Sequence, residues 1–156
     1  EGPKVVEYNS RLGDPETQVV LPLYRGDIVE LMLASCEGTI ASINPSGKDL
    51  VDGSAVCVVL ASAGYPDTYP TGKEIRGLQD LPERVVAFHA GTKSNAKMVV
   101  TDGGRVLGLT AISTTSDIEK TIKMAYDGVD RISFEGMHFR RDIGRKALLQ
   151  NAPGVK

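Results

Sequence analysis

Short apolar runs separated by glycine and proline recur from the middle of the chain onward, and this spacing is typical of β-strands. Ala55 to Ala61 is an unbroken apolar run, which indicates a strand buried on both faces. Further runs of strand character lie at residues 73–78, 85–89, 98–101 and 106–112. Asp102-Gly103-Gly104 between the last two predicts a hairpin turn, and residues 131–134 predict a short final strand.

Two segments instead show the spacing of amphipathic helices. In residues 28–38, apolar side chains recur three and four positions apart, and Asp27 precedes them as a capping residue. In residues 117–131, Ser116 and Glu119 have the spacing of a capping box. The apolar face of this second helix would consist of Ile118, Ile122, Ala125, Tyr126 and Val129.

The beginning of the chain predicts a strand followed directly by a helix. Residues 4–11 have strand character, and Asp14 and Pro15 are typical of a helix start, as cap and first helical residue. Residues 39–53 form a polar connector and are the best candidate for a subdomain boundary. The predicted fold class is therefore α+β, with a largely antiparallel sheet packed by at least one long helix.

Composition narrows the function classes without naming one. The chain has 156 residues and a formal net charge of −2, which argues against a nucleic-acid binder that works through a basic surface. No apolar run approaches the roughly 20 residues of a membrane span, so we expect no membrane association. Cys36 and Cys57 match no metal or redox spacing and predict buried, reduced thiols in a cytoplasmic protein.

Candidate chemistry begins in the first predicted strand. Side chains alternate faces along a strand, so Glu7, Asn9 and Arg11 would share one face. A carboxylate and an amide oxygen suit Mg²⁺, which completes its shell with substrate phosphates, and a guanidinium beside them can bind phosphate oxygens. A solvated edge strand accounts for the same three residues, so this pattern alone does not assign a metal site.

The residues that follow carry a family resemblance. Arg11 to Gln18 reads R-L-G-D-P-E-T-Q and satisfies a motif of the form R-[F/L]-G-D-P-E-x-Q. The chain here resembles the glycinamide ribonucleotide synthetases, or phosphoribosylamine–glycine ligases, of the ATP-grasp superfamily. Further blocks of the resemblance, in family order, lie at residues 55–62, 64–66, 88–92, 103–111 and 139–144. A carboxylase-type ATP-grasp component would share E-x-N-x-R but not the G-D-P-E-x-Q continuation.

The resemblance implies an ATP-dependent ligase of purine biosynthesis. Such enzymes phosphorylate glycine with ATP, and 5-phosphoribosylamine then attacks the acyl phosphate. By this likeness, Glu7 and Asn9 would bind Mg²⁺ or Mn²⁺, and Arg11 would be catalytic by stabilising phosphate charge. Asp14 would contact the ammonium group of glycine, or cap the helix, or both. Arg105 would contact a substrate phosphate, or simply follow a hairpin turn.

The resemblance also implies that the chain is incomplete. Residues 1–40 look like the end of an ATP-grasp domain, a strand with helices, and residues 41–156 look like the C-terminal domain. The glycine-rich lid and the ATP-binding lysine of the family precede this part, so we expect the remainder of the polypeptide as a partner and no activity from this chain alone. A non-catalytic module derived from such a ligase is the alternative.

Two weaker features stay open at this point. His89 ends a predicted strand and is read as structural or as part of the site. A basic cluster, formed by Arg140, Arg141, Arg145 and Lys146, would face the phosphate of phosphoribosylamine or pair with an acidic remainder of the enzyme. The sequence does not distinguish a separate enzyme from one fused to a later enzyme of the pathway.

Overall fold

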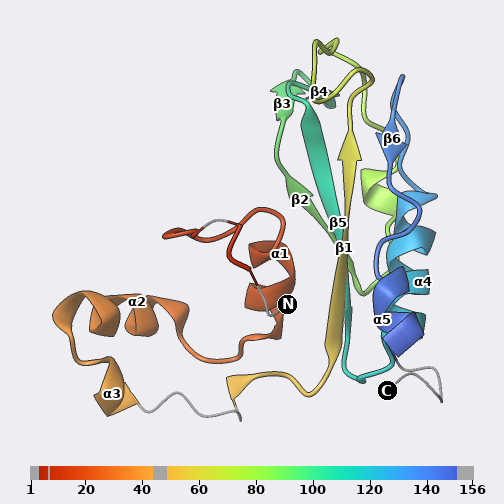
Figure 1. The fold of residues 1–156 in the computed structure, drawn as a ribbon. Helices are drawn as coiled ribbons and strands as arrows, with labels where there is room; N and C mark the ends of the chain where they lie inside the picture. Colours follow the sequence, from red (N-terminus) through yellow and green to blue (C-terminus); the bar gives the residue numbers. More distant parts are fainter. Residues whose placement is uncertain (1–3, 7, 44–48, 151–156) are drawn as a thin grey trace.

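The fold is built on a four-stranded antiparallel sheet. A computed structural model describes residues 4–6, 8–43 and 49–150. The strand order is β2 (Val85–His89), β5 (Arg105–Ser113), β1 (Ser54–Ala61) and β6 (His138–Phe139) (Figure 1). Helices lie on both sides of this sheet, so the predicted α+β class is confirmed.

The core lies on one face of the sheet, beneath the helix α4 (Ile118–Val129). Val58 pairs with Leu109 and Leu60 pairs with Leu107, and all four side chains are fully buried. Along β1, however, buried residues alternate with half-buried ones such as Cys57 and Val59, so only one face of the strand is fully covered. The prediction that this strand is buried on both faces is wrong for that reason.

Helix α4 begins one residue later than the capping box predicted. Asp117 caps it, because its Oδ1 accepts a hydrogen bond from the backbone N–H of Lys120 at 3.0 Å, so the expected cap at Ser116 is wrong. The predicted apolar face of the helix does pack on the core. Near its end, Gly128 lies so close to β2 that a Cβ atom there would stand 2.7 Å from Cγ1 of Val85.

The opposite face of the sheet is partly covered by the N-terminal part of the chain. Helix α1 (Thr17–Val20) and the 3-10 helix η1 (Leu21–Leu23) lie beside β1, on the side away from α4 (Figure 1). A Cβ atom on Gly108 of β5 would meet Cys57 Sγ at 3.1 Å and Gln18 Cγ at 4.0 Å, which places α1 directly on the sheet. The position of α1 decides where the G-D-P-E segment lies.

Helices α2 (Ile28–Glu37) and α3 (Ile40–Ile43) project away from the sheet (Figure 1). The predicted cap of α2 is confirmed, because Asp27 Oδ1 accepts from the N–H groups of Val29 and Glu30 at 2.8 and 3.2 Å. Several large apolar side chains of these two helices are exposed, namely Val29, Met32, Leu33 and Ile40. Cys36 on α2 is exposed too, so the prediction of a buried thiol is wrong there, whereas Cys57 is half-buried.

The predicted strand at residues 4–11 is wrong for the part that the structure describes. Residues 4–6 and 8–11 have no strand geometry, and none of the described strands pairs with them. A strand is stable only with a hydrogen-bonded neighbour, and Val6 and Tyr8 are almost fully exposed here. The argument that Glu7, Asn9 and Arg11 share a strand face therefore finds no support; Glu7 itself lies outside the described residues.

A predicted hairpin turn and two predicted strands are also wrong, because strand pairing depends on residues that are distant in the sequence. Strand β4 (Met98–Thr101) pairs with β3 (Thr92–Asn95) rather than with β5, so Asp102-Gly103-Gly104 joins two sheets and is no hairpin turn. Residues 73–78 and 131–134 form only isolated bridges, such as Arg76 with Ser133. The remaining elements are the 3-10 helix η3 (Leu78–Asp80) and helix α5 (Arg145–Gln150).

In the described part of the chain, none of the helices combines the length and the apolar character needed to cross a bilayer.

Candidate functional site

A cavity of about 410 Å³ opens where the G-D-P-E segment meets the end of β2. It is lined by Leu12, Gly13, Asp14, Thr17, Gln18, Leu21, Pro22, Phe88 and His89. We call it the Asp14 pocket. It joins two blocks of the sequence that the family resemblance singled out separately. Its polar side chains carry a carboxylate, a hydroxyl, an amide and an imidazole.

Asp14 is the most strongly held group of this pocket. Gln18 donates a hydrogen bond from Nε2 to Asp14 Oδ1 at 2.8 Å. Arg105 places Nη2 3.2 Å from Asp14 Oδ2 and donates from Nη1 to the backbone oxygen of Asp14 at 3.1 Å. The structure thus brings together Asp14 and Arg105, the two candidate substrate-binding residues. Asp14 does not cap α1, which begins at Thr17.

His89 lies at the rim of the same pocket. Its Nδ1 is 2.9 Å from Thr92 Oγ1, which fixes the ring, and among the described residues Nε2 has no hydrogen-bond partner. The imidazole is exposed. The structure therefore places His89 in the same pocket as Asp14, a relation that no sequence pattern indicates.

Arg11 and Asn9 lie outside the Asp14 pocket. Arg11 is exposed, and its Nη1 donates to the backbone oxygen of its neighbour Leu12 at 3.2 Å. Asn9 is exposed as well, and Glu7 lies outside the described residues. Among the residues that the structure describes, no group of three or more His, Cys, Asp or Glu side chains could hold a metal ion.

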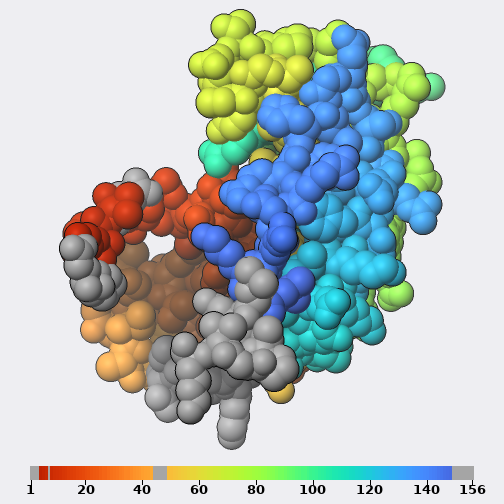
Figure 2. Space-filling model, turned by 45° about the vertical axis from the view of Figure 1, so that its right-hand side comes forward, coloured from red at the N-terminus to blue at the C-terminus, as the bar shows by residue number. Residues whose placement is uncertain are grey.

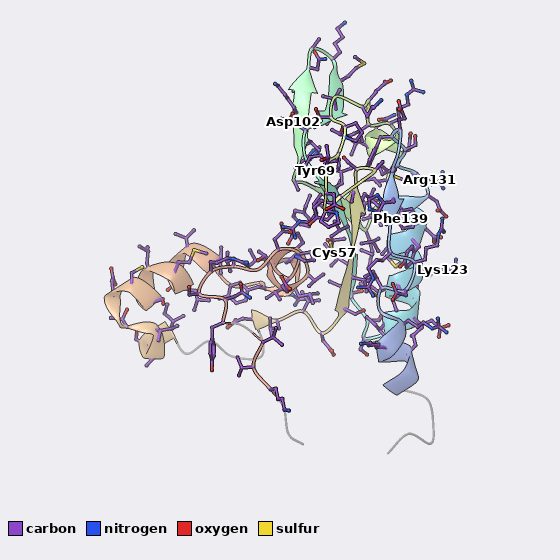
Figure 3. All side chains as sticks on the ribbon, turned by 45° about the horizontal axis from the view of Figure 1, so that its top comes forward. Cys57, Tyr69, Asp102, Lys123, Arg131 and Phe139 are labelled. Atoms are coloured by element: carbon purple, nitrogen blue, oxygen red, sulfur yellow. The ribbon has the colours of Figure 1, made fainter. Side chains whose placement is uncertain are left out.

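Cys57 lies under α1, on the face of the sheet away from α4; Figure 3 shows it opposite Lys123 and Phe139. Burial raises the pKa of its thiol above the ordinary value. A neighbouring polar atom, Gln18 Oε1, is also buried and has no partner among the described residues. Sequence reasoning did not identify Gln18 as a site residue; its place as the last residue of the G-D-P-E-x-Q motif was the available signal.

The four residues of the basic cluster lie in the C-terminal segment, and none of them lines the Asp14 pocket. In Figure 2 the blue C-terminal segment runs down one face of the molecule, and the red N-terminal segment projects at the side. Arg140 binds Asp142 at 2.7 and 2.9 Å and holds the pKa of that carboxyl below its ordinary value. Arg141 stacks over the Phe139 ring at 4.9 Å. The cluster does not face the Asp14 pocket.

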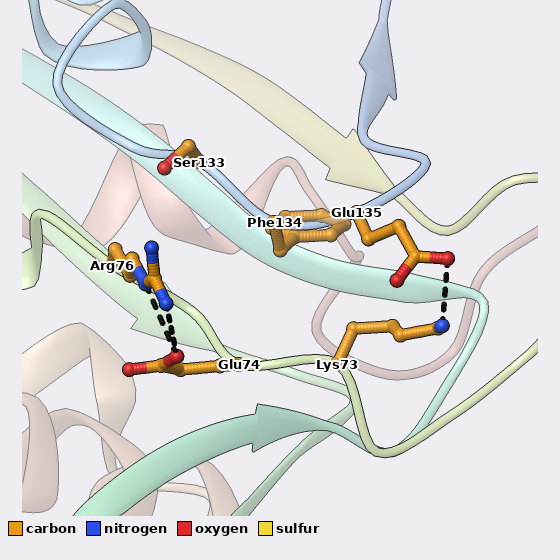
Figure 4. A pocket seen from close by; sticks show the side chains of 6 residues that line it. All are labelled: Lys73, Glu74, Arg76, Ser133, Phe134 and Glu135. Carbon is orange, nitrogen blue, oxygen red and sulfur yellow. Dashed lines mark hydrogen bonds and ion pairs between the residues drawn. The ribbon is translucent and has the colours of Figure 1, made fainter.

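A second cavity, of about 430 Å³, lies between residues 73–76 and 133–135 (Figure 4). Its charged side chains pair with one another: Lys73 Nζ is 2.7 Å from Glu135 Oε1, and Arg76 Nη2 is 2.7 Å from Glu74 Oε2. Asp14 is paired as well, with Arg105, so charge pairing does not distinguish the two cavities. The Asp14 pocket is the better candidate site because residues of the R-L-G-D-P-E-T-Q motif line it.

Comparison with known proteins identifies the same family as the sequence motif. Residues 55–146 match the family described as "Phosphoribosylglycinamide synthetase, C domain". The match covers β1, β2, β5, α4 and β6, that is, the sheet and the helix that covers its core face. This chain belongs to that family.

Relatives extend the likeness over almost the whole chain. The chain is 48% identical over 149 residues to a phosphoribosylamine–glycine ligase of Chlorobaculum tepidum, covering 94% of this chain and 34% of the relative. It is 46% identical over 149 residues to a trifunctional purine biosynthetic protein of Gallus gallus, covering 95% of this chain and 14% of the relative. The chain thus spans about a third, or less, of the length of the curated relatives it matches.

A solved structure shows the same fold. The crystal structure of a phosphoribosylamine–glycine ligase from Thermotoga maritima matches with a TM-score of 0.69 and 38% sequence identity. The match covers 88% of this chain and 32% of that chain. Both ligases are about three times as long as the part that matches this chain.

Proposed function

We propose that this chain is part of an ATP-dependent ligase that joins glycine to 5-phosphoribosylamine. The observation that carries the proposal is the family match over the sheet, together with relatives that bear the ligase name over 94% of the chain. The Asp14 pocket supports it, since the family motif itself forms the pocket wall. Residues 1–40 would end an ATP-grasp domain, and residues 41–156 would be the C-terminal domain.

The reaction has two chemical steps. ATP transfers its terminal phosphoryl group to a carboxylate oxygen of glycine, giving glycyl phosphate and ADP. The amine nitrogen of 5-phosphoribosylamine then forms a C–N bond with the glycyl carbon, the C–O bond to phosphate breaks, and the nitrogen loses a proton. Arg11 would stabilise the transferring phosphoryl group, because such transfers depend mainly on positioning and electrostatics.

Asp14 would bind the ammonium group of glycine. Its carboxylate lies in a pocket whose remaining walls are largely apolar, as Leu12, Leu21 and Phe88 are. A pocket of this kind suits a small ligand that offers one cation at a fixed position. The exposed end of His89 at the rim would then face the reacting end of the substrate.

A divalent metal ion, Mg²⁺ or Mn²⁺, belongs to this proposal. The donor set fits on chemical grounds, because Glu7 offers a carboxylate and Asn9 an amide oxygen, both hard ligands. Few protein ligands are needed, since Mg²⁺ usually takes its remaining ligands from substrate phosphates and water. When bound, the ion would supply charge neutralisation at the phosphates of ATP.

The test is turnover by the full-length polypeptide that contains this chain. We expect phosphate release that requires ATP, glycine and 5-phosphoribosylamine together. Residues 1–156 alone should give none, because nothing in them resembles the lid or the lysine that hold ATP in the family. A full-length protein without turnover would favour the non-catalytic module, and turnover by residues 1–156 would contradict the assignment of this chain as an incomplete ligase.

A further inference from the structure

We infer that Arg105 is a positioning residue, which acts together with Gln18 to orient the Asp14 carboxylate in the pocket. The C-terminal sheet would thereby set the position of the group that binds glycine. This inference rests on the proposed function and deepens it, because it assigns Arg105 to the amino-acid end of the site.

The contacts account for both terminal nitrogens of Arg105. Nη1 donates to the Asp14 backbone oxygen at 3.1 Å, and Nη2 lies 3.2 Å from Oδ2 of the same residue. A planar guanidinium that holds one residue at two points fixes both its main chain and its side chain. The second carboxylate oxygen is held from the other side, by Gln18 Nε2 at 2.8 Å. Asp14 is thus held by Arg105 of β5 and by Gln18 of α1.

The backbone that carries Arg105 is itself firmly held. Ser62 donates from its backbone N–H to the Gly104 oxygen and from Oγ to the Gly103 oxygen, both at 2.8 Å. A Cβ atom on Gly104 would stand 2.2 Å from Cδ2 of Tyr65, so the tyrosine ring lies directly on that glycine. The turn before Arg105 is therefore fixed on two sides.

The sheet adds a second constraint at the same place. The register of β1 and β5 shifts between Leu60 and Ala61, and Ala61 pairs with Arg105. Such an irregularity re-aims the side chains that follow it. On the other side of the turn, Gly91 donates from its N–H to the Arg105 oxygen at 2.8 Å. Arg105 is therefore presented to Asp14 from a rigid support.

This assignment differs from a direct contact with the phosphate of 5-phosphoribosylamine. A guanidinium that binds a substrate phosphate would present its terminal nitrogens to the ligand, whereas both are directed at Asp14 here. The two roles affect different substrates. A positioning role predicts an effect on glycine, and a phosphate contact predicts an effect on the amine substrate.

The experiment compares Arg105→Met and Arg105→Lys in the full-length enzyme by steady-state kinetics. We expect Arg105→Met to raise KM for glycine about ten-fold, the order of magnitude for losing a hydrogen bond to a charged group, while KM for 5-phosphoribosylamine stays within about two-fold. In Arg105→Lys, KM for glycine should rise less than in Arg105→Met, because the positive charge is kept. Gln18→Leu should also raise KM for glycine, since it removes the other support of Asp14 and leaves Arg105 in place.

Arg84→Met is the matched control, because Arg84 is exposed and its Nη1 donates only to Thr114 Oγ1. It should leave both KM values unchanged. A rise confined to KM for 5-phosphoribosylamine, or unchanged kinetics in both Arg105→Met and Gln18→Leu, would overturn the inference. If Arg105→Met fails to fold, the KM for glycine of Gln18→Leu tests the inference, and an unchanged value overturns it. A wild-type protein without turnover would overturn the proposed function, and this inference with it.

Discussion

At the scale of single residues, the candidate site is defined by contacts between groups far apart in the chain. Asp14 is held by a neighbour on its own segment, Gln18, and by Arg105 from the sheet. Arg105 lies 91 residues from Asp14 in the sequence, so no local pattern indicates their contact. The motif nevertheless contains two of them, Asp14 and Gln18, so the family resemblance points to the segment that lines the Asp14 pocket.

Arg11 gives a test at this scale that is independent of the Asp14 pocket. If Arg11 binds the transferring phosphoryl group, Arg11→Lys should lower kcat by a factor on the order of 10²–10³, because an ammonium group cannot replace the planar fork. The loss should fall on kcat more than on KM for ATP, since the contact belongs to the transition state. Full-length enzyme kinetics measure both.

The exposed Arg25 provides a control for that substitution, because Arg25→Lys changes the same group on the same segment. We expect Arg25→Lys to leave kcat and KM for ATP unchanged. Near-normal kcat in a folded Arg11→Lys variant would remove Arg11 from the catalytic residues and leave it as an exposed side chain.

The two cysteines should differ sharply in reactivity. The thiolate is the reactive form, and burial both shields Cys57 and raises its pKa, whereas Cys36 on α2 is exposed. Alkylation near about pH 8 should therefore modify Cys36 first, as followed by peptide mass spectrometry. In a Cys36→Ser variant, the slower alkylation of Cys57 can be measured alone. Equal rates at both thiols would contradict the position of α1 over β1.

At the scale of elements, the packing of α4 on the sheet can be tested through one close approach. A Cβ atom on Gly128 would stand 2.7 Å from Val85 Cγ1, and Val85 is buried. Overpacking costs about 1–3 kcal/mol, and the gain in helix propensity from Gly to Ala offsets about 1 kcal/mol. Gly128→Ala should therefore lower the free energy of unfolding by about 1 kcal/mol in denaturant titrations.

A double variant separates the clash from other causes. Val85→Ala removes the methyl groups that the new Cβ would meet, so the double variant with Gly128→Ala should be more stable than the sum of the two single effects predicts. Strict additivity would show that the two side chains do not meet.

The sequence predicted elements well where the signal is local. Helices α2 and α4 and strands β1, β2 and β5 follow from the apolar spacing within each element, and the start of α2 follows also from its capping residue Asp27. The pairing of β3 with β4 and the isolated bridges at residues 73–78 depend on partners elsewhere in the chain, so no local pattern contains them. The segment at residues 4–11 has strand-like composition, but its described part belongs to none of the strands.

At the scale of the whole molecule, the sheet and the N-terminal segment depend on each other for the site. Helix α1 lies on one face of the sheet while α4 covers the other (Figure 1). Residues of the α1 segment and of the end of β2 together line the Asp14 pocket. The exposed apolar side chains of α2 fit the larger polypeptide that the relatives' length indicates. In this account the C-terminal domain supports the site by holding Asp14.

The central claim is that the Asp14 pocket binds glycine, and KM for glycine in a full-length Asp14→Asn variant tests it most directly. The substitution keeps the shape of the side chain and removes the negative charge that an ammonium group would meet. We predict a rise in KM for glycine of at least about ten-fold, with KM for ATP unchanged, because a charge-assisted contact is lost. An unchanged KM for glycine in a folded, active variant would contradict the account.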